Sequence, residues 1–272
     1  MTKYYLITAV IFVNCLFLRA QQTGAPQQPS AGGRGARAQA DPIDFEDHPG
    51  WTQMFDGKTL NGWDGNPEVW KVVDGTIGCG FSSPEGTRNP GGFIAWKGGD
   101  IADFELKLEI KLEGATADSG IEYRAWPTAG GGGRGSAAAP APPANPWNLG
   151  GYQFDFNFPG TFNGNVAAGA SNRGTIAYRG QIVRAEEGKR PRQIGTVGKF
   201  EELGGYFKVA DWNQIHMIAS GHTFTQFING RLMSMLIDED STKFRPKGLI
   251  GLQCAGTGTM RIAFRNLWLR TM

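Results

Sequence analysis

The chain has 272 residues, of which 41 are Gly and 15 are Pro, a high content of turn formers that still suits a folded protein. Hydrophobic residues make up 40% of the chain, enough for a substantial core. The formal charge is +2, and four basic residues against one acidic residue precede residue 43. The remaining chain, with 23 basic and 24 acidic residues, lacks the basic surface that nucleic-acid binding needs, so no nucleic-acid partner is expected.

The N-terminus has the pattern of an export signal. Lys3 precedes an apolar run that is too short to span a membrane as a helix. We therefore expect residues 1–20 to be a signal peptide, the protein to be secreted or periplasmic, and the mature chain to have no membrane span. Cys15 leaves a lipid anchor as the alternative. Residues 21–45, rich in Gly, Pro and Gln, are predicted to be a disordered linker before a single domain at 46–272.

From Trp51 onward, the sequence is a series of short strand patterns separated by turn signals. Asp-Gly and Asn-Gly pairs recur, as at Asn229-Gly230, and such pairs favour the backbone angles of tight hairpins. In residues 103–113, apolar residues alternate with Glu and Lys, which predicts a strand with one buried face and one charged face in water. Helical periodicity is nearly absent, apart from one turn at 199–203. About a dozen strands without alternating helices predict an all-β fold, either a sandwich or a barrel.

Two low-complexity stretches, 129–146 and 180–198, are predicted to be loop insertions. Because each adjoins a strand with candidate polar residues, we expect both to border the functional face. Cys79 and Cys254 lie in apolar strand patterns. Export permits a disulfide between them, but two buried thiols fit the sequence as well. No His or Cys pair has the local spacing of a zinc site.

Several sequence phrases follow one another in a characteristic order. Residues 51–77 read WTQMFDGKTLNGWDGNPEVWKVVDGTI, followed by SGIEYRAW at 119–126, GGYQFDF at 150–156 and GLIGLQCAGTGTMRIAFRNLWL at 248–269. Together these phrases resemble the 3-keto-disaccharide hydrolase domain family over residues 50–272. The resemblance implies a concanavalin A-like jelly roll, a β-sandwich of two antiparallel sheets, which agrees with the strand patterns. It also implies a glycoside-cleaving hydrolase with a carbohydrate or glycoside substrate.

Two strand patterns that are otherwise apolar or aromatic carry polar side chains on the face away from the core. Alternation places four of them there: Glu122, Arg124, Gln153 and Asp155. In such a jelly roll, the outer face of one sheet is concave, so polar groups on it can meet a carbohydrate. We expect these four residues to form a shared site. A structural arginine–carboxylate network and unrelated surface charges are the alternatives.

Four further residues are expected around that site. Gln226 and Gln253 are predicted to be flanking amides, and Trp147 and Tyr178 carry rings that can stack on a sugar. Core packing or rim cover explains both rings equally well. Many relatives have a histidine where this chain has Gln226, and another where it has Ala255. Without these histidines, a non-catalytic carbohydrate-binding domain of the same fold stays open as the alternative to an enzyme.

The chemistry that the resemblance implies starts from a sugar ketone. A ketone at C3 acidifies the proton on C2, so the C1 substituent can leave by β-elimination, and hydration then completes the hydrolysis. Such an enzyme needs a base near C2, donors to the C3 oxygen, and an acid or a metal near the leaving oxygen. Asp155 or Glu122 is the expected base. The expected donors are Arg124, Gln153 and Gln253. A divalent cation held by carboxylates is left open, and a direct two-carboxylate glycosidase is the neighbouring alternative.

Overall fold

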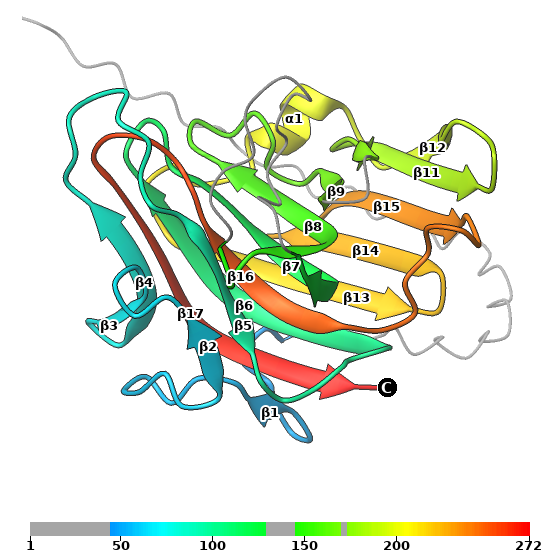
Figure 1. The fold of residues 1–272 in the computed structure, drawn as a ribbon. Helices are drawn as coiled ribbons and strands as arrows, with labels where there is room; N and C mark the ends of the chain where they lie inside the picture. Colours follow the sequence, from blue (N-terminus) through cyan, green and yellow to red (C-terminus); the bar gives the residue numbers. More distant parts are fainter. Residues whose placement is uncertain (1–43, 129–144, 170–172) are drawn as a thin grey trace, which may run out of the picture. The chain divides into compact units, whose positions relative to one another are not determined.

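The computed structural model describes residues 44–128, 145–169 and 173–272. Asp44–Met272 form one compact unit, which is a two-layer β-sandwich (Figure 1). The only helix among the described residues is the short α1 (Phe200–Gly204), at the predicted turn. The all-β, two-sheet prediction is therefore confirmed. The expected signal peptide, and the expected linker up to residue 43, lie outside the described residues.

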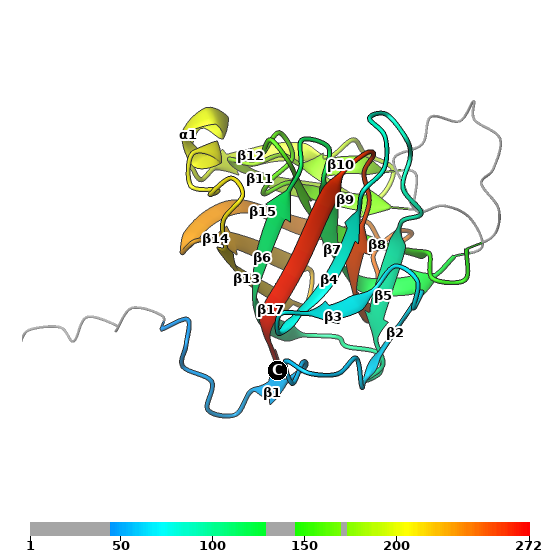
Figure 2. The same cartoon turned by 90° about the vertical axis from the view of Figure 1, so that its left-hand side faces the viewer.

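The larger sheet has ten strands, and its ladders are antiparallel except for the pairing of β11 with β15. In sheet order the strands are β12 (Arg192–Thr196), β11 (Gln181–Glu186), β15 (Arg231–Glu239), β14 (Thr223–Ile228), β13 (Asn213–Ser220), β6 (Phe104–Glu113), β17 (Met260–Thr271), β4 (Thr76–Phe81) and β3 (Lys71–Val73), with β1 (Thr52–Gln53) paired to β17. Figure 2 views this sheet from the side of β6, β17 and β4, with β7 and β8 of the other sheet behind them.

The smaller sheet has seven strands and is antiparallel throughout. In sheet order they are β10 (Gly174–Ala177), β9 (Val166–Gly169), β8 (Leu149–Asn157), β7 (Asp118–Pro127), β16 (Leu249–Cys254), β5 (Gly92–Trp96) and β2 (Trp63–Gly65). The main hydrophobic core fills the space between the two sheets. β7 therefore lies at the centre of the smaller sheet, between β8 and β16.

The alternating pattern at 103–113 forms β6 in the middle of the larger sheet. Its apolar side chains all lie in the core: Phe104, Leu106, Leu108, Ile110 and Leu112. The prediction that its charged face lies in water is wrong for the middle of the strand, where Lys107 is 3% exposed and Glu109 is 8% exposed. The beginning of the domain covers this face. The Lys107 ammonium donates to the Asp44 carbonyl at 2.8 Å and lies 4.7 Å from the centre of the Trp51 ring.

Cys79 of β4 and Cys254 of β16 form a disulfide. Both residues belong to the buried core, and their strands belong to different sheets. The disulfide therefore joins the two layers of the sandwich. Of the two alternatives that the sequence left open, the structure contains the disulfide.

Residues 180–198 contain a hairpin, so the prediction of a loop insertion is wrong there. β11 and β12 pair with each other and extend the larger sheet beyond β15. Val183 and Ala185 are buried and alternate with partly exposed neighbours, which gives this basic, polar stretch one apolar face. The other predicted insertion, 129–146, lies outside the described residues except for its last two positions.

Candidate functional site

The outer face of the smaller sheet carries Glu122 at its centre. Its chain neighbours on β7, Ile121 and Tyr123, belong to the core between the sheets. Alternation along a strand therefore points Glu122 to the outside. Gln153 of β8 lies directly opposite Glu122, and Asp155 lies opposite Gly120 on the same face. The structure thus brings three of the predicted residues, Glu122, Gln153 and Asp155, onto neighbouring strands.

Gln253 of β16 reaches the same group from the other side of β7. The Gln153 Nε2 donates to the Gln253 Oε1 at 2.9 Å, which links β8 to β16. The link passes directly over β7, because a Cβ added to Gly120 would lie only 2.3 Å from Gln153 Nε2. A side chain at position 120 would therefore have to displace Gln153. Gln253, one of the two predicted flanking amides, thus lies beside Glu122 and forms an amide pair with Gln153 through this hydrogen bond.

Glu122 itself is isolated. Its side chain has no exposed surface, and neither carboxyl oxygen has a hydrogen-bond partner. Burial alone raises the pKa of Glu122 well above that of an ordinary glutamic acid. The carboxyl group therefore keeps its proton at pH values where an ordinary glutamic acid has lost it. Leaving a buried polar group without a partner costs about 1–3 kcal/mol, so such a group is a candidate for function.

Asp155 is held by its backbone on the same face. Its N–H donates to the Asn165 carbonyl at 3.1 Å, and its carbonyl accepts from the Gly164 N–H at 3.2 Å. The register makes Asp155 a diagonal neighbour of Glu122, and such residues are about 7–8 Å apart. The site therefore has two buried carboxyl groups on adjacent strands, with the amide pair next to them.

Arg124 does not join this group. Its φ is +46°, and the pairing of β7 with β8 shifts register between Tyr123 and Trp126. This irregularity is a β-bulge, which redirects a side chain from the alternating pattern. The buried guanidinium instead donates to the Asp103 carboxylate and to three carbonyl oxygens, those of Ala102, Gly221 and Arg245. The predicted placement of Arg124 beside Glu122 is wrong, and its contacts are structural.

Gln226 lies in the other sheet and faces the interior. Its Nε2 donates to the Tyr123 hydroxyl at 3.1 Å, and its Oε1 accepts from the Ser234 hydroxyl at 3.3 Å. The predicted place of Gln226 as an amide beside Glu122 is therefore wrong. The sequence contained the signal, since Gln226 alternates in step with the core residues Phe224 and Ile228.

The two predicted aromatic residues lie farther away. The Trp147 indole N–H donates to Asp64 at 3.4 Å. Cross-strand register connects Asp64 to Glu122 through Ala95 and Gly251, so Asp64 lies on the same face, three strand spacings or about 14 Å from Glu122. Tyr178 lies between β10 and β11, is 49% exposed, and is not part of the group around Glu122.

Sequence reasoning missed an apolar cluster on this face. Phe93, Ala125 and Leu149 are buried together, with Ala95 and Leu249 packed against them, and they are separate from the main core. Leu149 lies over Gly251, where an added Cβ would be 2.4 Å from its Cδ1. The sequence contained a signal for this cluster. Gln253 was predicted to point outward, and alternation along β16 places Leu249 and Gly251 on the same outward face.

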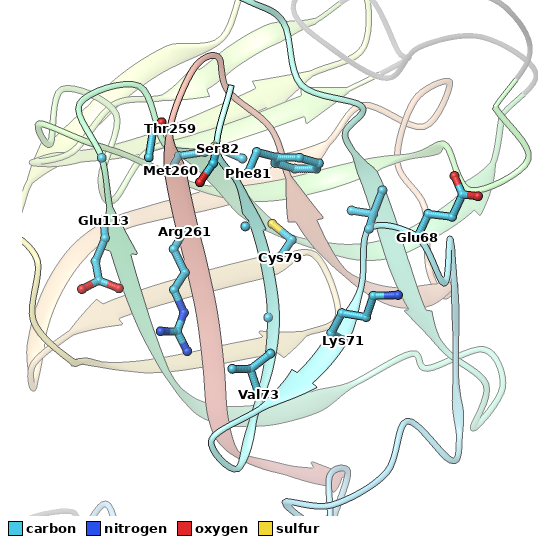
Figure 3. A pocket seen from close by; sticks show the side chains of 14 residues that line it. Glu68, Lys71, Val73, Cys79, Phe81, Ser82, Glu113, Thr259, Met260 and Arg261 are labelled. Carbon is cyan, nitrogen blue, oxygen red and sulfur yellow. The ribbon is translucent and has the colours of Figure 1, made fainter. Parts of the chain in front are cut away.

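A hollow of about 500 Å³ lies elsewhere, at the β3–β4–β17 edge of the larger sheet (Figure 3). Gly78 and Gly80 are part of its lining. Several of its charged side chains have partners: Arg261 pairs with Asp74, Glu113 pairs with Lys111, and Lys71 donates to the Pro67 carbonyl. It contains none of the predicted site residues, so the Glu122 face remains the candidate site.

The described residues contain no group of three or more His, Cys, Asp or Glu placed to hold a metal ion. Within the same residues, no helix has the length and apolar character needed to cross a membrane.

Several solved structures are similar to this chain. A Bacillus subtilis protein of unknown function with a galectin-like fold superposes with a TM-score of 0.52 at 10% identity, over 83% of this chain and 97% of that chain. A proposed glycosyl hydrolase from Parabacteroides distasonis gives 0.48 at 18% identity, over 82% and 99%. A legume lectin-like domain from Entamoeba histolytica gives 0.45 at 14% identity, over 86% and 100%.

No curated protein matches the sequence. Residues 50–270 match the family described as the 3-keto-alpha-glucoside-1,2-lyase-like domain. This range includes strands of both sheets up to residue 270, and with them Glu122, Gln153, Asp155 and Gln253. The protein therefore belongs to the 3-keto-alpha-glucoside-1,2-lyase-like domain family.

Proposed function

We propose that this protein cleaves 3-keto-glycosides by removing the proton from C2 and releasing the C1 substituent. The observation that carries the proposal is Glu122, a fully buried carboxyl group without a hydrogen-bond partner. Asp155 and two amides lie on the same face, so an acid, a base and hydrogen-bond donors are available together. The family match supports the choice of substrate.

Glu122 is the proton donor in this proposal. Because burial raises its pKa, the carboxyl group holds its proton at the pH where an ordinary glutamic acid has lost it. A protonated carboxyl can pass that proton to the leaving oxygen as the bond from C1 breaks. This assignment separates two residues that the sequence could not rank, since Glu122 becomes the acid and Asp155 the base.

Asp155 takes the proton from C2, and negative charge then develops on the C3 oxygen. Gln153 uses one N–H of its amide for Gln253, which leaves its second N–H and the Gln253 NH₂ as donors to that oxygen. The products of this step are the free alcohol and an unsaturated sugar ketone. Addition of water to its double bond gives the 3-keto sugar and completes a net hydrolysis.

Substrate binding must move side chains, because Glu122 has no exposed surface. Gln153 lies over Gly120 and Leu149 lies over Gly251, on either side of Glu122. We expect these two side chains to shift when a sugar enters.

The location of the reaction is a separate part of the proposal. Because residues 1–20 have the pattern of an export signal, we propose that the enzyme meets its substrate outside the cytoplasm.

The test compares a 3-keto-glucoside with the same glucoside before oxidation. We expect the purified protein to release the alcohol from the keto form alone, because only the ketone makes the C2 proton acidic. Asp155→Asn should lower turnover by about 10²–10⁴-fold, the usual contribution of a general base. Asp74→Asn, at an exposed position on the other sheet, is the matched control. Glycan binding without conversion of any 3-keto substrate would instead establish the carbohydrate-binding alternative.

A further inference from the structure

On the outer face of the smaller sheet, the side chains of β7, β8 and β16 change from polar to apolar along the direction of the strands. Toward one end of β7, the face carries Asp155 opposite Gly120, with Gln253 beside them. One alternation step further, Glu122 has Gln153 directly opposite. The part of these strands from Gly120 to Glu122 therefore carries carboxyl and amide groups.

The residues beyond Glu122 are apolar. Ala125 lies opposite Leu249 of β16, and Leu149 begins β8 opposite Pro127. Ala125, Leu149 and Leu249 belong to the apolar cluster described above. On these strands, Glu122 therefore lies at the boundary between the polar groups and the apolar cluster.

This boundary fixes how a substrate must lie if Glu122 protonates the leaving oxygen. The sugar ring places its C2 proton and C3 oxygen toward Asp155 and the amide pair, which are all on the polar side. The C1 substituent then extends from Glu122 in the opposite direction. We infer that this substituent is an apolar alkyl or aryl group, held by Leu249, Leu149 and Ala125. The inference rests on the proposed function and names the substrate class of the same site.

The physical reason is the cost of burying unpaired hydroxyl groups. A second sugar in this position would bring several hydroxyls against Ala125, Leu149 and Leu249, none of which has a polar side chain. Each hydroxyl buried without a hydrogen bond costs about 1–3 kcal/mol in proteins. An alkyl or aryl group instead gains from leaving water, by about 0.8 kcal/mol per buried methylene. The cluster therefore discriminates against disaccharides.

The experiment uses 3-keto-glucosides of methanol, ethanol, propanol and butanol. These alcohols have similar acidity, so their reactivity as leaving groups hardly changes and differences in kcat/KM report contacts with the protein. We expect kcat/KM to rise by about two- to fourfold per methylene. We also expect the butyl compound to be cleaved faster than a 3-keto-disaccharide. A flat series, or a preference for the disaccharide, would overturn the inference.

Leu249→Asn places a polar side chain of similar size in the cluster. It should reduce the butyl-to-methyl ratio of kcat/KM toward 1. Leu232→Asn is the matched control, because Leu232 is a half-buried strand leucine of the larger sheet, opposite Phe227. The control should keep the wild-type ratio. If Leu249→Asn does not fold, Leu249→Ala makes the same comparison with a smaller expected change.

Binding of the unreactive methyl and butyl glucosides separates this inference from the proposed function. Tighter binding of the butyl compound without turnover of any 3-keto-glycoside would remove the function and retain the apolar subsite. Turnover with no dependence on chain length, in rate or in binding, would retain the function and remove the subsite.

Discussion

Glu109 and Glu122 are both buried carboxyl groups on long central strands, one on the outer face of each sheet, but their surroundings differ. Glu109 accepts hydrogen bonds from Arg265 Nε at 2.8 Å, Arg265 Nη2 at 3.3 Å and Asn266 Nδ2 at 2.6 Å. Glu122 accepts none. Burial is common to both residues, so the presence or absence of partners separates a structural carboxylate from a candidate catalytic one.

The same contrast extends over the two faces. On the larger sheet, Glu105 pairs with Arg270 at 2.7 Å, and its second oxygen lies 3.4 Å from His216. The Arg265 guanidinium also lies over the Trp212 ring, 4.1 Å from its centre. Such paired charges stabilise the fold without requiring a ligand. On the smaller sheet, Glu122 instead lies next to glycines and the apolar cluster, and no cation or hydrogen-bond donor of the described residues pairs with it. Its carboxyl group is therefore available for a substrate.

Exchange of each glutamic acid for glutamine is the most direct test of this contrast. Glu122→Gln removes the proposed proton donor, so turnover of an alkyl 3-keto-glucoside should fall by about 10²–10⁴-fold. The loss should be much smaller for a nitrophenyl 3-keto-glucoside, because a nitrophenolate leaves without protonation. Steady-state rates with both substrates measure the difference. Equal losses for the two leaving groups would contradict the acid role.

The second prediction concerns Arg124, which the sequence placed beside Glu122 and the structure places elsewhere. Arg124→Met removes every donor of a buried guanidinium and leaves three backbone carbonyl oxygens without that partner. The charged guanidinium also bonds Asp103, and hydrogen bonds to a charged group contribute about 1.5–3 kcal/mol each, so we expect a loss of about 3 kcal/mol or more in the free energy of unfolding. Denaturant unfolding measures it. If the variant had normal stability but strongly reduced turnover, Arg124 would have a role in catalysis and not in folding.

Glu109→Gln should affect stability and leave the chemistry unchanged. The glutamine keeps the shape of the side chain but weakens the charged hydrogen bonds with Arg265, at a cost of about 1–3 kcal/mol. The value of kcat should stay at the wild-type level. If Glu109→Gln lowered kcat as much as Glu122→Gln, the contrast between the two faces would be lost.

The smallest expected effect is in the pH dependence of stability. The pKa of Glu122 is raised in the folded state, so above the ordinary value of 4.5 the native protein binds more protons than the unfolded chain. This group therefore makes the free energy of unfolding decrease as pH rises from 4.5 toward the folded pKa. Glu122→Gln should remove that decrease, so the variant gains stability relative to wild type with rising pH. Parallel curves for the two proteins would mean that Glu122 is not desolvated.

Much of the fold could be predicted because alternation is local. The pattern in residues 103–113 identified β6 and its core side chains, and the same rule placed Glu122, Gln153 and Asp155 on one face. The rule failed at Arg124, where a bulge interrupts it. At Gln226, alternation with Phe224 and Ile228 indicated the interior, but only the structure supplied the Tyr123 and Ser234 partners that make a buried amide possible.

By itself, the sequence determined most of the strands outside residues 180–198, the two-sheet class, the family and the outward direction of the three central polar residues. All of these depend on residues close together in the chain or on phrases in a fixed order. The tertiary structure decided which carboxyl has a partner and which does not. Arg265 reaches Glu109 across a separation of 156 residues, and Cys79 bonds Cys254 across 175. No local pattern encodes such pairs, because strands distant in sequence become neighbours only when the sheets assemble.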